Sequence, residues 1–121
     1  MFRIRVPSPS ICAVGALLGW LFIPLLAAQA DDGDSPGSAR KRELTRLVLQ
    51  DCGSCHGMRL TGGLGPPLTH DVIAGKPRDA MVATIIHGRH GTPMPPWRGL
   101  LTEADAGWIV DRLREGDLDA R

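Results

Sequence analysis

Apolar residues are arranged in two different ways along this chain. From Ile11 to Ala28 they form an almost unbroken run, whereas from Ala39 onward they recur every three or four residues among polar ones. The second arrangement has the period of an amphipathic helix, while the first leaves no polar face. Between the two, Asp, Gly, Ser and Pro fill the stretch from Asp31 to Ser38, which predicts a flexible linker.

Three amphipathic helices are predicted beyond this linker. The first begins at Ala39, and its apolar face, continued by one turn, reaches Cys52. The second spans Arg78 to His87, and the third runs from a capping-box sequence at Thr102–Asp105 to about Arg114. Their apolar positions are, in order, Leu44, Leu47 and Val48; Met81, Val82, Ile85 and Ile86; and Trp108, Ile109 and Leu113.

The segment between the first two helices is rich in glycine and proline. These residues recur throughout 57–77, so no regular element longer than one turn is expected there. The sequence shows no strand-like alternation and no internal repeat. The predicted fold class is therefore all-α. A small domain with such irregular connections has few side chains for a core, which favours a bound apolar group.

The N-terminal run has the features of an export signal. Arg3 and Arg5 precede the apolar residues, and Ala28-Gln29-Ala30 offers a small-x-small cleavage site before Asp31. The sequence therefore predicts a secretory signal peptide over residues 1–30 and a periplasmic product without stable membrane insertion. The alternative is an uncleaved membrane anchor, which two glycines and a proline within the run disfavour.

Cleavage at that site divides the chain into a signal peptide (1–30), a linker (31–38), one folded domain (39–117) and a short tail (118–121). Of the three cysteines, Cys12 lies in the signal peptide, which leaves one pair for the domain. The 14 basic and 13 acidic residues nearly balance and form no polybasic stripe. This charge pattern argues against nucleic acid as a partner.

The cysteine pair lies in Cys52-Gly53-Ser54-Cys55-His56. This spacing is typical of covalent c-type haem attachment, in which two thiols bind the vinyl groups of one haem edge and the adjacent histidine binds the iron. A thioredoxin-like pair requires a βαβ context, and a zinc site requires further cysteine or histidine ligands. Neither is present, and a structural disulfide is the remaining alternative. We predict one haem c attached through Cys52 and Cys55, with His56 on the iron.

The second axial ligand has to come from downstream and from the opposite face of the haem. Met58 is too close to His56 to reach that face. The candidates further along are His70, Met81, His87, His90 and Met94. Met94 leads, because the prolines around it stiffen the loop that must hold a weak thioether against iron.

His90 is the rival candidate, since imidazole binds ferric iron well. Met81 is interpreted as a core residue of its helix. His70 and His87 are interpreted as surface or helix-end residues. The sequence thus favours Met94 but leaves His90 open.

Three motifs together resemble the class I cytochromes c of the short bacterial type. They are Cys52 to His56, Gly65-Pro66-Pro67-Leu68 and Pro93-Met94-Pro95-Pro96-Trp97, and the resemblance covers Ala39 to Arg114. It implies an all-α class I cytochrome c fold, in which short helices wrap around one covalently bound haem.

The same resemblance implies a role for each matching residue. His56 is the expected proximal ligand, Met94 the distal ligand, and Cys52 and Cys55 the thioether anchors. The carbonyl of Pro66 is expected to accept a hydrogen bond from His56 Nδ1–H, which orients the imidazole. One departure is visible, because Leu44 and Val48 stand where these cytochromes usually carry a glycine and an aromatic residue.

A narrower resemblance rests on five short stretches of the sequence. Cys-Gly-Ser-Cys-His-Gly-Met, Gly-Gly-Leu-Gly-Pro-Pro-Leu, Ile-Ile-His-Gly-Arg, Gly-Thr-Pro-Met-Pro-Pro-Trp and Trp-Ile-Val-Asp-Arg-Leu are similar to the small NirC-type cytochromes of denitrification gene clusters. That similarity implies an electron donor to cd-type nitrite reductase. The alternative it implies is a helper in the assembly of the haem d cofactor.

Closed axial ligation by histidine and methionine favours a carrier of single electrons over an enzyme. An enzyme or a ligand-binding protein would need a displaceable distal ligand and an acid–base group, for which His90 is the candidate. The haem edge beside the cysteines is expected to be exposed, and redox partners are expected to dock on an apolar rim around it. The residues expected in this rim are Met58, Leu60, Leu64, Pro95 and Pro96.

Overall fold

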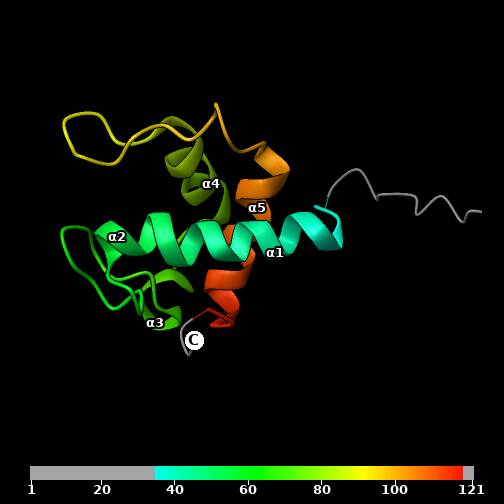
Figure 1. Ribbon diagram of the computed structural model, residues 1–121. Coiled ribbons are helices and arrows are strands. Elements are labelled where there is room, and N and C mark those ends of the chain that lie inside the picture. Colours follow the sequence, from blue (N-terminus) through cyan, green and yellow to red (C-terminus); the bar gives the residue numbers. More distant parts are fainter. Residues whose placement is uncertain (1–34, 119–121) are drawn as a thin grey trace, which may run out of the picture.

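The computed structural model describes residues 35–118, and every element in this range is helical (Figure 1). The elements are α1 (Ser38–Leu47), the π-helical turn η1 (Val48–Cys52), α2 (Gly53–His56), α3 (His70–Ile73), α4 (Arg78–His87) and α5 (Glu103–Glu115). The all-α prediction is confirmed. The expected signal peptide and the first part of the expected linker lie outside the described residues. Within residues 35–118, no helix has the length and apolarity needed to cross a bilayer.

Helices α1 and α2 are joined through η1 without a break (Figure 1). The first helical residue is Ser38, one position before the predicted start. The predicted apolar face is present, because Leu44 and Val48 are fully buried and Cys52 packs against the core. The backbone N–H of Gly53 bonds the carbonyl of Val48, five residues back. Such π-helical turns are rare and often occur at functional sites.

The two later helices have the predicted bounds to within one residue. Helix α4 spans the predicted residues, and α5 ends one residue after the predicted position. The capping box of α5 is formed, since Thr102 Oγ1 accepts from Asp105 N at 3.1 Å and Asp105 Oδ2 accepts from Thr102 N at 3.0 Å. Gly116 ends α5 in the left-handed conformation, and Asp117 N bonds Arg112 O behind it.

One apolar core joins the helices, and α5 contacts α1, α3 and α4 (Figure 1). Leu118, which the sequence placed in the tail, is 3% exposed and belongs to this core. Trp108 is half-buried against the core, and the guanidinium carbon of Arg112 lies 6.0 Å from its ring centroid. The buried core residues are Leu44, Val48, Leu60, Ile73, Ile86, Leu101, Ala106, Ile109, Leu113 and Leu118.

A bidentate ion pair ties α1 to the start of α5. Arg40 donates to both carboxylate oxygens of Asp105, at 3.2 and 3.0 Å, and to the carbonyl of Leu100 at 2.9 Å. Asp105 is 5% exposed, so its charge is compensated mainly by Arg40 and by the capping bond from Thr102 N. The Arg40 guanidinium, together with the bonds from Thr102, lowers the pKa of the Asp105 carboxyl below its usual range.

This ion pair predicts a specific loss of stability in acid. A carboxyl whose pKa is lowered by folding stabilises the protein above its unfolded pKa of about 3.9, and this contribution disappears as the pH falls through the lower folded pKa. We expect Asp105→Asn to lower the free energy of unfolding by about 1–3 kcal/mol at neutral pH, because Arg40 loses the more buried of its two charged partners, Glu43 being the other. The measurement is thermal unfolding of the holoprotein by circular dichroism between pH 2 and pH 7.

The difference in unfolding free energy between the native protein and Asp105→Asn should become smaller below about pH 4, where the Asp105 carboxyl also becomes protonated. Glu103→Gln is the matched control, because Glu103 is an exposed carboxylate on the same turn of α5. A difference in unfolding free energy that stays constant across the whole pH range would contradict the assignment of the effect to the charge of Asp105.

Candidate cofactor-binding site

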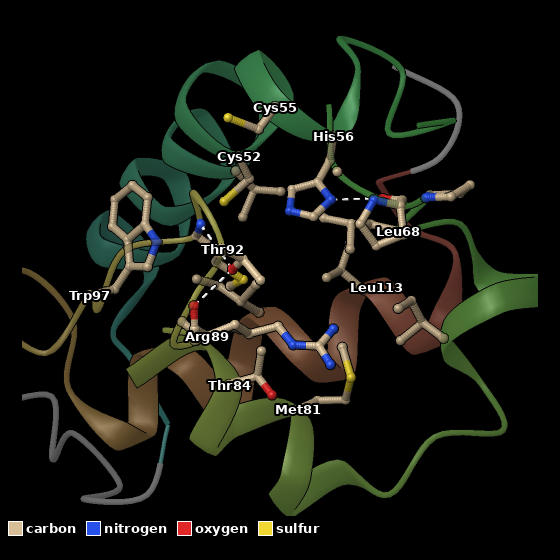
Figure 2. Close-up of a pocket in the computed structure, with 18 of the residues that line it drawn as sticks. Cys52, Cys55, His56, Leu68, Met81, Thr84, Arg89, Thr92, Trp97 and Leu113 are labelled. Atoms are coloured by element: carbon tan, nitrogen blue, oxygen red, sulfur yellow. Dashed lines mark hydrogen bonds between the residues drawn. The ribbon is translucent and has the colours of Figure 1, made fainter. Parts of the chain in front are cut away.

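A cavity of about 650 Å³ lies between the elements that carry the three sequence motifs. It is lined on one side by η1, α2 and the loop after α2, and on the other by α4 and the Pro93–Trp97 loop; Figure 2 shows a close-up. The lining is mostly apolar and includes Leu68, Ile73, Ile85, Ile109 and Leu113. Both cysteines of the motif, His56, Pro66 and Met94 also line it. The structure therefore brings every predicted site residue to one cavity.

His56 is held by the segment that follows it. Its Nδ1 lies 2.7 Å from the carbonyl oxygen of Pro66, so Nδ1–H donates to this carbonyl and Nε2 keeps a free lone pair beside the cavity (Figure 2). A Cβ atom on Gly65 would lie 2.7 Å from His56 Cε1 and 2.8 Å from Nδ1. Only glycine at this position lets the chain pass so close to the ring. The imidazole is thus oriented for a metal ligand bond.

The loop after α2 satisfies the carbonyl groups at the end of that helix. Gly62 N bonds His56 O at 2.8 Å, and Gly65 N bonds Cys55 O at 2.8 Å. Leu60, which precedes both glycines in this loop, has a φ of 58° and is fully buried in the core. The expectation that Leu60 belongs to an exposed rim is therefore wrong. Its unusual backbone conformation turns the side chain inward, which the sequence pattern of a glycine-rich loop does not reveal.

Cys52 and Cys55 are both free thiols on consecutive turns beside the cavity (Figure 2). Burial, together with the nearby charge of Asp51, raises the pKa of the Cys52 thiol to about 11. At neutral pH this thiol is protonated, unlike the reactive thiolate of a redox-active Cys-x-x-Cys pair. Within residues 35–118, no group of three His, Cys, Asp or Glu side chains gathers as a set of metal ligands.

The Met94 segment is built onto the end of α4. Trp97 N and Arg98 N bond the carbonyls of Ile85 and Ile86 at 3.1 and 3.2 Å. Arg89 N bonds Met94 O at 3.2 Å, which closes a tight loop around residues 90–93. The prolines and these bonds together fix the loop, as its composition predicted.

Gly88 lies directly under this loop at a φ of 68°. A Cβ atom there would be 2.7 Å from Met94 O, Pro95 C and Pro96 N, so the backbone of the loop rests on the glycine. Sequence reasoning missed this contact. The signal was available, since a glycine directly after a predicted helix indicates a position that requires a positive φ or a close approach of the backbone.

The candidates for the second axial ligand are separated by their positions. Met94 and Met81 line the cavity, whereas His70, His87 and His90 do not. His70 Nδ1–H instead donates to the carbonyl oxygen of Arg114 at the end of α5. His87 and His90 are exposed.

Comparison with known proteins gives a consistent picture. Residues 39–111 match the family model for "Cytochrome C oxidase, cbb3-type, subunit III". Cytochrome c55X of Pseudomonas aeruginosa is 56% identical over 102 residues, which cover 82% of this chain and 86% of that protein. A solved structure of the c-type cytochrome NirC superposes with a TM-score of 0.67 at 61% identity, over 69% of this chain and 98% of the other.

A larger relative contains a similar region. Dihydro-heme d1 dehydrogenase of Pseudomonas aeruginosa is 37% identical over 98 residues, which are 80% of this chain but only 18% of that protein. A region resembling this chain is therefore a small part of a longer polypeptide there.

Proposed function

The chain belongs to the c-type cytochromes and carries one haem c bound through Cys52 and Cys55, and from this premise we propose that it is a periplasmic carrier of single electrons in denitrification. The protein supplies a pocket that fits the group, since its apolar lining suits a porphyrin and its two thiols stand beside it. The signal peptide predicted over residues 1–30 supports the periplasmic location.

We propose His56 and Met94 as the two axial ligands. The bond from His56 Nδ1–H to Pro66 O supports the first, because it leaves Nε2 as the donor atom and raises its basicity. The second is supported by the position of Met94 in the cavity lining and by the loop fixed on Gly88. Haem c supplies an iron that changes between the ferric and ferrous states. Held by these two side chains, the iron would have no open position for a substrate.

This ligation favours a carrier over an enzyme. An enzyme would need an open or displaceable position beside an acid–base residue. The exposed His90, outside the cavity lining, is poorly placed for that role.

The proposed acceptor is a cd-type nitrite reductase. The support is the resemblance to the small NirC-type cytochromes, together with the 61% identity to a structure of that name. Partners would dock on an apolar rim of Met58, Leu64, Pro95 and Pro96, all of which are exposed. Leu64 is 89% exposed and also lines the cavity, so it lies where a partner can approach the haem.

Electron transfer to a purified cd-type nitrite reductase tests this proposal. Stopped-flow oxidation of the ferrous cytochrome should show a rate that depends only modestly on salt, because the rim is apolar. Leu64→Glu should slow the reaction about fivefold, which corresponds to ~1 kcal/mol of lost apolar contact. Leu100→Glu is the matched control, since Leu100 is 69% exposed but does not line the cavity. A steep fall of the rate with salt would show docking dominated by charge.

A second candidate function is a role in the assembly of haem d. It is favoured by the relative named dihydro-heme d1 dehydrogenase, which includes a region similar to this chain. In this case the ferric cytochrome would accept electrons from such a dehydrogenase. Reduction by the purified dehydrogenase with no transfer to the nitrite reductase, at any salt concentration, would favour this second function.

A further inference from the structure

Arg89 is an exposed residue that lines the mostly apolar cavity and brings a positive charge to it. Figure 2 shows its side chain extending from the loop before Met94 into the cavity, toward Met81 and Thr84. None of the ion pairs formed among residues 35–118 includes Arg89. A carboxylate that accepts two parallel N–H bonds matches the planar geometry of a guanidinium, which makes it a well-suited partner for Arg89.

Hydrogen bonds hold the backbone of Arg89, which fixes the point from which its side chain leaves the main chain. Arg89 N bonds Met94 O at 3.2 Å, while Arg89 O accepts from Thr92 N at 3.1 Å and from Thr92 Oγ1 at 2.8 Å. In Figure 2, Cys52 and Cys55 lie on one side of the cavity, and the Arg89 guanidinium lies on the other, with Met81 and Thr84.

The bound haem brings carboxylates to that side. A haem fastened to Cys52 and Cys55 by its vinyl edge has its two propionate groups at the opposite edge of the ring. Arg89, which forms no ion pair within residues 35–118, and the carboxylates of the cofactor are therefore on the same side of the site. The cavity holds one other basic residue, Lys76, and one acidic residue, Asp51, which adjoins Cys52 in sequence.

We propose that the Arg89 guanidinium binds a haem propionate and thereby raises the reduction potential of the iron. The inference rests on the proposed function, because it concerns the haem that makes this protein a carrier. A propionate charge near the iron stabilises the ferric state, and a guanidinium paired with it offsets part of that charge. Arg89 acts through the propionate and is a positioning residue, not an iron ligand.

The test is the midpoint potential of Arg89→Gln holoprotein, measured by spectroelectrochemistry at pH 7. We expect the ratio of ferrous to ferric protein at a fixed applied potential to fall about threefold to tenfold. A tenfold fall corresponds to a decrease of about 59 mV in the midpoint potential of a one-electron couple. Arg89→Lys should recover part of the shift, because it keeps the charge but loses the bidentate geometry. Arg98→Gln is the matched control, since Arg98 is exposed in the same region and does not line the cavity.

Resonance Raman spectra give an independent readout. The propionate bending modes should differ between the native protein and Arg89→Lys, and not between the native protein and Arg98→Gln. Equal potentials in the native and Arg89→Gln proteins would overturn the proposal, as would a shift found in Lys76→Gln instead. Because these variants retain the covalent haem and its axial ligands, their visible spectra show separately whether the proposed carrier site is intact.

Discussion

The Cys52→Ala, Cys55→Ala double variant is expected to contain no covalently bound haem. Acid–acetone extraction of the native protein should leave the colour with the polypeptide, because both thioether bonds survive the treatment. The same extraction of the variant should remove all haem. Ser54→Ala is the matched control, since Ser54 lies between the two cysteines, is exposed and does not line the cavity. Haem that is extracted from the native protein would contradict covalent attachment.

The same variant is expected to lose its cooperative thermal unfolding transition. Without haem, the apolar side chains of α4, α5 and the loop after α2 that line the cavity of about 650 Å³ are exposed to water. Burial of such surface is the main favourable term in folding, and the net free energy of unfolding of a small domain is low. Circular dichroism at 222 nm, a helix signal, provides the measurement. A sharp transition like that of the holoprotein would show that the helices fold independently of the cofactor.

Met94→Ala is expected to abolish the thioether ligation of the iron. The weak charge-transfer band of the ferric protein near the red end of the visible spectrum should disappear, and the midpoint potential should fall by on the order of 100 mV. The cause is the loss of a soft ligand that stabilises ferrous iron. Absorption spectroscopy of the purified ferric protein is sufficient to detect the change.

His90→Ala is the matched control for this prediction. His90 belongs to the same loop but is exposed and outside the cavity lining, so its variant should keep both the band and the potential. If the band disappears in His90→Ala and persists in Met94→Ala, His90 is the ligand. The enzyme interpretation would then be open again, because a histidine that can leave the iron would also serve as an acid–base group.

The helices could be predicted closely because their signals are local. The apolar face of α1, the bounds of α4 and the capping box of α5 each depend on residues within one or two turns of each other. The attachment motif is equally local, since Cys52, Cys55 and His56 are adjacent on one helix end. For these elements the sequence pattern and the packed structure agree.

Features that depend on contacts between distant segments were not predictable in the same way. The ion pair between Arg40 and Asp105 joins residues 65 positions apart, and nothing in either neighbourhood indicates the other. The burial of Leu60 depends on a positive φ that this residue type rarely adopts. The π-helical turn η1 has no sequence signal, because it differs from an α-helix by a single shifted bond.

The arrangement of the two segments that carry the proposed ligands, His56 and Met94, has a consequence for the order of folding. The bond from His56 to Pro66 spans 10 positions, and the bond from Arg89 to Met94 closes an even smaller loop. Each segment can therefore close at small entropic cost, while the pairing of Arg40 with Asp105 must wait for a long loop to close. Contact order thus places the docking of α5 on α1 last. The exported chain can therefore form the local structure around His56 and Met94, the two proposed ligands, before its terminal helices meet.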